Sequence, residues 1–310
     1  MPVRITLPAF GLQSAAAKNL VDLLVSAGWK PTRLRPAVAE PVANSIGIFS
    51  EGKNAVWKPE SRGRQAAPAA FPFYPDMFRD SDFFLATKNY ALYGDEFDLS
   101  RTHWVFIADL GGYTADFAML GFDLARPDKT FEAAATDSKE KYAYYSEPIG
   151  IAGLDARVRA VLPPDQQAAF DDMLQEVDPR LETFHRMFYN DFRPFRSRGV
   201  RIGSGAEIEL VRRIVSDFAE EVATYAERFL DLHQFERVDQ LLITGGGYNV
   251  PVIRDALVRK LENYELRRVY RPVSRLDPEL PQLHSRLDPR FVRGSTALGG
   301  ASVYFEGLAS

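Results

Sequence analysis

The chain has 310 residues, of which 46% are hydrophobic and 26% charged, a globular composition with room for two domains or one two-lobed domain. The absence of cysteine excludes disulfides, thiolate catalysis and cysteine zinc sites, and the four histidines are too dispersed to predict a metal cluster. A formal net charge of -4 gives no general reason to expect nucleic acid or an anionic membrane as a partner.

The first fifty residues alternate between short extended and helical patterns. In chain order we expect a strand over 3–7, a helix over 13–27, an extended piece over 32–34 and a second helix over 39–49. The N-terminus lacks the positive region and apolar run of a secretory signal, and no stretch is long and apolar enough to span a bilayer. We therefore expect a cytoplasmic protein.

Residues 52–101 differ from the rest of the chain. They are rich in proline and aromatic residues and show no sustained period. The aromatic content argues against free disorder, so we interpret the segment as a long ordered insertion. A surface loop packed by its own Phe and Tyr side chains is the favoured role, ahead of a binding role.

From residue 103 the pattern becomes regular. We expect strands over 104–110, 114–122, 130–135, 200–202 and 238–244, and helices over 151–162, 165–192, 207–232, 250–261 and 291–305. The first three strands, joined by tight turns, predict an antiparallel meander. The long helix over 207–232 has an apolar face made by Ile208, Val211, Ile214, Val215, Phe218 and Val222.

The first chemical signal is the segment DLGGYTAD, which a buried strand delivers at Asp109. Gly111 and Gly112 predict a turn with positive φ that a ligand can approach closely, and the backbone N–H groups of such a turn form an anion-binding concavity. Thr114 adds a hydroxyl donor. Asp109 and Asp116 suit a hydrated Mg²⁺ bound to phosphates, or a water aligned for attack. A plain hairpin is the alternative, but this spacing between two apolar strands favours function.

The second signal is LLITGGG over 241–247, followed by a helix with Pro251 in its first turn. A buried strand, a glycine turn and a helix N-terminus together form a recurring nucleotide-contact geometry, in which a ring or ribose lies on bare backbone. A tight strand-to-helix connection without a ligand is the alternative. We hypothesise a binding role, with less weight than for the first turn.

Together the two turns resemble those of the actin/DnaK/sugar-kinase superfamily of ATPases. Residues 109–116 are similar to its second phosphate motif, and residues 241–251 to its adenosine motif. Residues 5–10, ITLPAF, and 40–47, EPVANSIG, resemble the strand and first connecting helix of DnaK-type chaperones, and residues 292–301 resemble the second connecting helix. Order and approximate spacing agree along nearly the whole chain apart from the insertion.

The resemblance implies an α/β protein with the actin-like ATPase (ribonuclease H-like) fold, in which two lobes of mixed sheet flanked by helices hold ATP in a cleft. Residues 1–104 would be the remainder of the first lobe, including the insertion over about 52–101. Residues 105–310 would be the second lobe, with the nucleotide-binding turns and a helical subdomain over about 151–200.

The resemblance also implies roles for three carboxylates and a proline. Asp109 would orient a Mg²⁺-bound water, and Asp116 would be a second carboxylate near the metal. Glu40 would belong to the Mg²⁺ shell or position water. Pro8 would match the family's hinge-side proline.

The implied ligand contacts come from both turns and one helix. Gly111, Gly112, Tyr113 and Thr114 would cradle the phosphates of ATP or ADP, and Gly245, Gly246 and Gly247 would bound the adenosine pocket. In chaperones the opposite wall of the pocket comes from a helix with the pattern Glu-x-x-Lys-Arg. The nearest match here ends at Arg186 and has His185 in place of the lysine.

The sequence departs from the family in one respect with a physical consequence. The family opens with an Asp-x-Gly-x-Thr hairpin that grips the β- and γ-phosphates, and no segment of this chain matches it. We therefore expect an incomplete first lobe, weak ATP binding and negligible hydrolysis by this chain alone. We also expect an exposed sheet edge or apolar face around Val3–Leu7 that favours self-association.

Three functions are compatible with these motifs. The leading hypothesis is an ATP- and Mg²⁺-binding module of a DnaK/actin-like ATPase, which in the intact protein hydrolyses ATP by in-line attack of water. The alternative is a non-catalytic actin-like structural or regulatory subunit. A small-molecule kinase is the weakest, because EPVANSIG resembles chaperones. The expected partners are an adenine nucleotide and a protein or a second copy, with no nucleic acid and no membrane.

Overall fold

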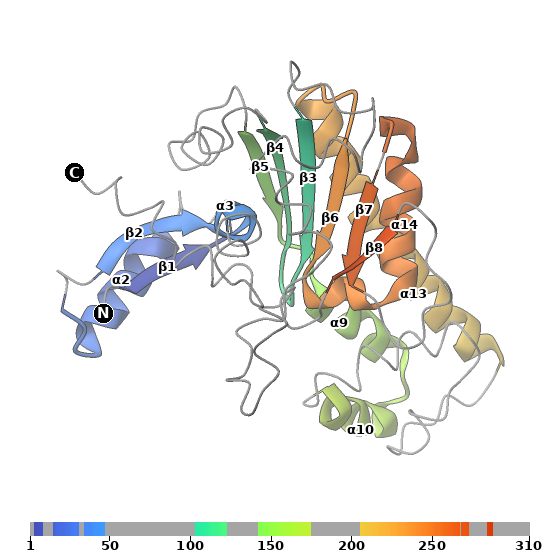
Figure 1. The fold of residues 1–310 in the computed structure, drawn as a ribbon. Coiled ribbons are helices and arrows are strands. Elements are labelled where there is room, and N and C mark those ends of the chain that lie inside the picture. Colours follow the sequence, from blue (N-terminus) through green and yellow to red (C-terminus); the bar gives the residue numbers. More distant parts are fainter. Residues whose placement is uncertain are drawn as a thin grey trace, which may run out of the picture.

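The computed structural model describes residues 3–8, 15–30, 34–46, 103–122, 142–174, 205–266, 268–272 and 284–287. In these residues the protein is α/β, with a small parallel sheet near the N-terminus and a larger mixed sheet flanked by helices (Figure 1). The insertion over 52–101, the strands expected over 130–135 and 200–202, and the helix expected over 291–305 lie outside the described residues.

The N-terminal unit contains a two-stranded sheet, in which β1 (Val3–Leu7) and β2 (Leu34–Ala39) run parallel. Helix α2 (Ala15–Ser26) connects them, and α3 (Glu40–Ile46) follows β2 directly. The strand over 3–7 and both helices are confirmed. Of the extended piece expected over 32–34, only residue 34 is described, and it is the first residue of β2. Pro36 is compatible with a strand that keeps an unpaired edge.

The larger sheet has the strand order β5-β4-β3-β6-β7-β8. Its strands are β3 (His103–Leu110), β4 (Ala115–Phe122), β5 (Tyr142–Glu147), β6 (Gln240–Thr244), β7 (Arg268–Pro272) and β8 (His284–Leu287). Strands β3, β4 and β5 form an antiparallel meander, of which the sequence predicted the first two strands, whereas β3, β6, β7 and β8 run parallel. The sequence missed β5, β7 and β8. These short segments lack a clear alternation of apolar and polar residues, and β7 and β8 contain arginine.

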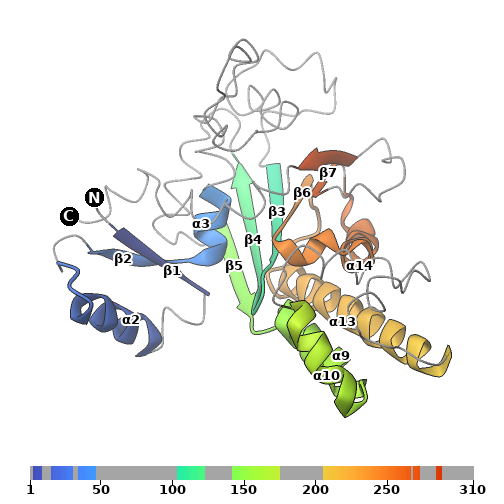
Figure 2. The same cartoon turned by 90° about the horizontal axis from the view of Figure 1, so that it is seen from below.

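Helices cover both faces of this sheet. On one face lie α13 (Gly205–Leu232) and α14 (Pro251–Leu261), next to α9 (Ile151–Val161), while α3 approaches β3, β4 and β5 from the other (Figures 1 and 2). Helix α10 (Pro164–Leu174) follows α9 and confirms the start of the second expected helix of that region. The larger unit is therefore a mixed sheet between helices, which confirms the coarse part of the predicted fold.

The alternation of side chains along the strands decides which residues reach the site. Phe106, Ala108 and Leu110 point into the core under α13, so Asp109 faces the side on which α3 lies. On α13, the predicted face is confirmed at four buried positions, Val211, Val215, Phe218 and Val222, and Ile214 packs against the same core.

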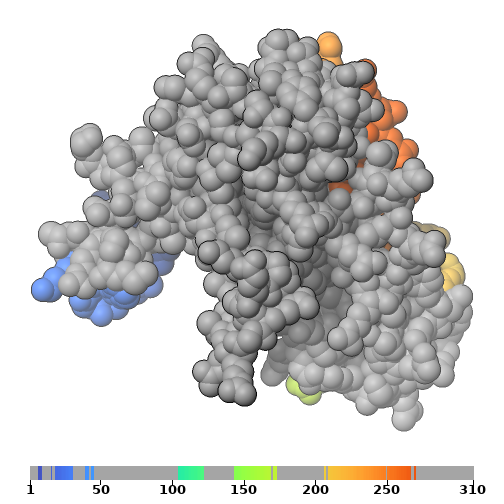
Figure 3. Space-filling view, in the orientation of Figure 1, coloured from blue at the N-terminus to red at the C-terminus, as the bar shows by residue number. Residues whose placement is uncertain are grey.

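Several of the described helices contribute to the molecular surface (Figure 3). In the space-filling view the N-terminal unit is visible at one side, and residues of α13 and α14 are visible at the other (Figure 3). Among the described residues no helix has the length and apolar character needed to cross a membrane.

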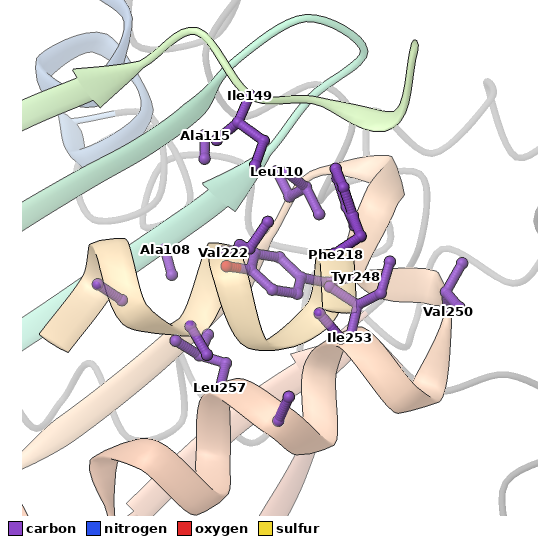
Figure 4. Packing of buried hydrophobic residues seen from close by; sticks show 14 of the residues in the cluster. Ala108, Leu110, Ala115, Ile149, Phe218, Val222, Tyr248, Val250, Ile253 and Leu257 are labelled. Carbon is purple, nitrogen blue, oxygen red and sulfur yellow. The ribbon is translucent and has the colours of Figure 1, made fainter. Parts of the chain in front are cut away.

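Tyr248 carries an unsatisfied hydroxyl in the core. Its ring is fully buried beside Val222 and Phe218 (Figure 4), and its Oη has no hydrogen-bond partner within the described part of the chain. Burial, followed by the nearby Asp109 charge, raises the pKa of Tyr248 above its usual value, so the phenol stays neutral.

We expect Tyr248→Phe to raise the free energy of unfolding by about 1 kcal/mol, because it removes a buried hydroxyl that gains no bond. Urea unfolding followed by circular dichroism measures this difference. A loss of stability in the variant would mean that the hydroxyl is bonded in the folded protein.

Candidate functional site

The two glycine turns lie side by side at one edge of the larger sheet. Strands β3 and β6 are parallel neighbours, and their register pairs Asp109 with Thr244. Strand β4 returns antiparallel from the first turn, so Asp116 stands opposite Asp109. The segments 109–116 and 241–247, separated by more than a hundred residues in sequence, therefore form one site.

Three carboxylates gather at this edge. Asp109 is the last residue but one of β3, Asp116 is the second residue of β4, and Glu40 is the first residue of α3. Burial raises the pKa of Asp109 well above its usual range, and the charges of Asp116 and Glu40 add to the effect. Burial also raises the pKa of Asp116, and burial together with the Asp116 charge raises the pKa of Glu40 to about 7. Within the described part of the chain, no Lys or Arg forms an ion pair with any of the three.

Neutral donors orient two of these carboxylates. The amide nitrogen of Asn44 donates to Oδ2 of Asp109 at 2.6 Å and to Oγ1 of Thr244 at 2.9 Å. The hydroxyl of Thr114 donates to Oδ2 of Asp116 at 2.9 Å, and the hydroxyl of Ser146 donates to its Oδ1. These bonds favour the ionised carboxylates and oppose the effect of burial.

Thr114 therefore acts differently from the sequence-based expectation. Its hydroxyl, expected to donate to a phosphate, donates to Asp116 instead. Sequence analysis also missed Asn44, Thr244 and Ser146 as site residues. Two signals were present: Asn44 follows Glu40 by four residues and so shares its helix face, and Thr244 is the polar residue that ends an apolar strand.

In the first turn the carbonyl groups of the two glycines accept backbone hydrogen bonds. The Gly111 N–H donates to the Thr114 carbonyl at 2.8 Å, while the Gly111 and Gly112 carbonyls accept from Ile151 and Ala152 at 3.2 and 2.7 Å. In the part of the chain that the structure describes, the N–H groups of the three residues from Gly112 to Thr114 donate no backbone hydrogen bond. An anion is the natural acceptor for such consecutive donors.

The backbone conformation of this turn differs from the prediction. Gly111 and Gly112 do not adopt positive φ, so that expectation is wrong. A Cβ on Gly112 would meet no atom within 4 Å, so no contact within the chain requires glycine there. Tyr113 is 82% exposed, so its backbone, and not its side chain, belongs to the turn.

Gly150 supports the first turn and was missed by sequence analysis. It immediately precedes α9, and a Cβ there would lie 2.5 Å from the Gly112 carbonyl oxygen and 2.5 Å from the Tyr113 nitrogen. This close approach lets the start of α9 donate to the turn carbonyls. The sequence signal was only a glycine before a helix, which is common.

The second turn packs against the first strand. Gly245 has φ 82°, and a Cβ there would overlap Asp109 Oδ1 and the Leu110 backbone. A Cβ on Gly247 would lie 2.5 Å from the Leu110 side chain. At these two positions glycine is required by the packing of the strand-to-helix connection against β3, and their place in an adenosine pocket stays a prediction. Gly246 is partly exposed, and Pro251 opens α14 as expected.

Two of the three carboxylates fit a hydrated Mg²⁺. Among the described residues no group of three or more His, Cys, Asp or Glu side chains could form a metal cage. Mg²⁺ commonly binds through one or two carboxylates, several waters and substrate phosphates, and Asp109 and Asp116 fit that pattern. Arg186 and the pattern that contains it lie outside the described residues.

The raised pKa of Glu40 predicts a pH-dependent stability. Glu40 titrates at about 7 in the folded protein, against 4.5 for its ordinary value, so the folded state binds more protons between these pH values. The free energy of unfolding should therefore fall as pH rises from about 4.5 to 7. Because the side chain is partly exposed, we expect Glu40→Gln to be more stable than the original chain by only about 1 kcal/mol at pH 8.

Thermal and urea unfolding at pH 5 and pH 8, without added metal, measure this effect. A variant that follows the same pH slope as the original chain would show that Glu40 does not cause it.

Comparison with known proteins gives no independent identification. No protein-family model matches the chain, and no curated protein matches its sequence. The resemblance to the actin/DnaK superfamily therefore depends on the sequence motifs alone.

Proposed function

We propose that the chain is the ATP- and Mg²⁺-binding part of an actin/DnaK-type ATPase, with the actin-like fold and cytoplasmic location that the sequence suggests. The observation that carries the proposal is the carboxylate cluster of Asp109, Asp116 and Glu40 beside a turn whose N–H groups from Gly112 to Thr114 donate no backbone hydrogen bond among the described residues. Donors for an anion and acceptors for a cation stand next to each other, and a metal nucleotide carries both charges.

The turn after β3 would bind phosphate oxygens. The carbonyls of Gly111 and Gly112 are occupied by the start of α9, so the backbone presents donors on its other side. The open space at Gly112 allows close approach to the backbone. Gly246, which is partly exposed, remains the position of the second turn where an adenosine group could lie on backbone.

The carboxylates would serve the metal and the attacking water. Asp109 and Asp116 would hold the hydrated Mg²⁺, which supplies positive charge next to the phosphates when bound. Asp109 would accept a hydrogen bond from the water whose oxygen attacks the γ-phosphorus as the bond to ADP breaks. Asn44 keeps one Asp109 oxygen engaged, so the carboxylate is held in a fixed orientation.

Gly112→Ala tests the phosphate contact. A methyl group fits within the chain at this position, so the melting temperature should stay unchanged, whereas the affinity for ATP with Mg²⁺ should fall about tenfold because the methyl blocks the backbone. Calorimetric titration measures the affinity, beside a phosphate-release assay.

The matched control is Gly153→Ala on α9, where a Cβ also meets no atom within 4 Å and no ligand is expected. Equal affinity of both variants and the original chain would remove the turn from the binding site. ATP binding without phosphate release in an intact protein would instead favour the non-catalytic subunit.

A further inference from the structure

We propose that Asn44 is a positioning residue that fixes the Asp109 carboxylate and ties α3 to the ends of β3 and β6, an inference whose functional part rests on the proposed function. Asn44 is 1% exposed, and its amide nitrogen lies 2.6 Å from Asp109 Oδ2 and 2.9 Å from Thr244 Oγ1. One side chain thus joins three elements at the site.

The direction of the hydrogen bonds is set by the groups involved. An amide nitrogen only donates and carries two hydrogens, so Asn44 can serve Asp109 and Thr244 together. The Thr244 hydroxyl hydrogen then turns to the Ala108 carbonyl, at 3.4 Å. A substitution that removes the amide takes one neutral side-chain donor from Asp109 and leaves Thr244 as the other neutral group against it.

Helix α3 brings two functional groups to the carboxylates from one face. Glu40 and Asn44 are four residues apart and therefore neighbours on the helix surface. Glu40 adds negative charge near Asp109, while Asn44 adds a donor. The position of the N-terminal unit consequently sets how Asp109 is oriented toward a metal nucleotide.

The first experiment separates positioning from general stabilisation. ATP affinity is measured by calorimetry with Mg²⁺ and with EDTA for the original chain and for Asn44→Ala. We expect the Mg²⁺-dependent affinity to fall about tenfold and the affinity in EDTA to change by less than about twofold, because Asp109 acts on the metal side. An equal fall in both conditions would overturn the proposal.

The control is Asp239→Ala. Asp239 is buried and accepts from the Trp104 N–H at 2.8 Å at the opposite end of β3, so its loss should lower stability without touching the site. It should leave the ratio of the two affinities unchanged. Asn44→Ser, which keeps one donor hydrogen, should give an intermediate ratio and replaces Asn44→Ala if that variant does not fold.

The second experiment needs no nucleotide, so it distinguishes failure of this inference from failure of the proposed function. The free energy of unfolding is measured for Asn44→Ala, Asp109→Ala and the double variant. Coupling that changes the folded-to-unfolded ratio by about tenfold supports the positioning role. Either single substitution already breaks the hydrogen bond between Asn44 and Asp109, so the double variant does not lose it a second time. Additive effects would overturn it, even if ATP binds; coupling without ATP binding would leave the positioning role and remove the proposed function.

Discussion

Gly245→Ala should lower the free energy of unfolding by about 3 kcal/mol and should abolish nucleotide binding. Two costs combine at this position. The backbone has φ 82°, which alanine adopts with difficulty, and a Cβ would overlap Asp109 Oδ1 and lie 2.5 Å from the Leu110 backbone nitrogen and oxygen. To accommodate the methyl group, β3 and β6 must separate where the carboxylate cluster is built.

Gly28→Ala is the matched control for Gly245→Ala. Gly28 follows α2 with φ 92°, but a Cβ there would meet no atom within 4 Å. It therefore carries the conformational cost without the overlap, and we expect a loss of only about 1 kcal/mol with unchanged binding. Urea unfolding and calorimetric titration measure both variants. Equal losses would mean that the overlap with Asp109 is relieved at no cost.

Gly150→Ala should have the second-largest effect, a loss of about 2 kcal/mol together with loss of phosphate binding. Its φ of -146° is accessible to any residue, so the cost comes only from contact. A Cβ would lie 2.5 Å from backbone atoms of Gly112 and Tyr113, and these atoms can yield only if the turn moves away from α9. The hydrogen bonds from Ile151 and Ala152 to the turn would then be lost.

Gly153→Ala, three residues later on α9, should have the opposite sign. It lies inside the helix on an exposed surface, so alanine should raise the free energy of unfolding by about 1 kcal/mol. The two variants are compared by urea unfolding and by titration with ATP. A stable Gly150→Ala variant with normal affinity would show that the contact between α9 and the turn has no role.

Local sequence determined the elements and the chemistry of the first turn. Apolar runs of the right length predicted β3, β4 and β6, and the period of the long helix predicted the buried face of α13 that includes Val211 and Phe218. Asp109 and Asp116 were identified because each lies close to a strand end, and a strand end next to a tight turn is a property of neighbouring residues. The backbone conformation of the turn was not predicted correctly, because Gly111 and Gly112 do not adopt positive φ.

Only the tertiary structure decided which groups share the site. Asn44 is 65 residues from Asp109 and 200 residues from Thr244, and their hydrogen bonds exist because α3 lies on the sheet face opposite α13 and because β3 pairs with β6 in one register. The requirement for glycine at 150 and 245 likewise comes from backbone that arrives from elsewhere in the chain. Helix and strand periods are local, but register and close approach are set by packing between distant segments, which a single sequence does not specify position by position.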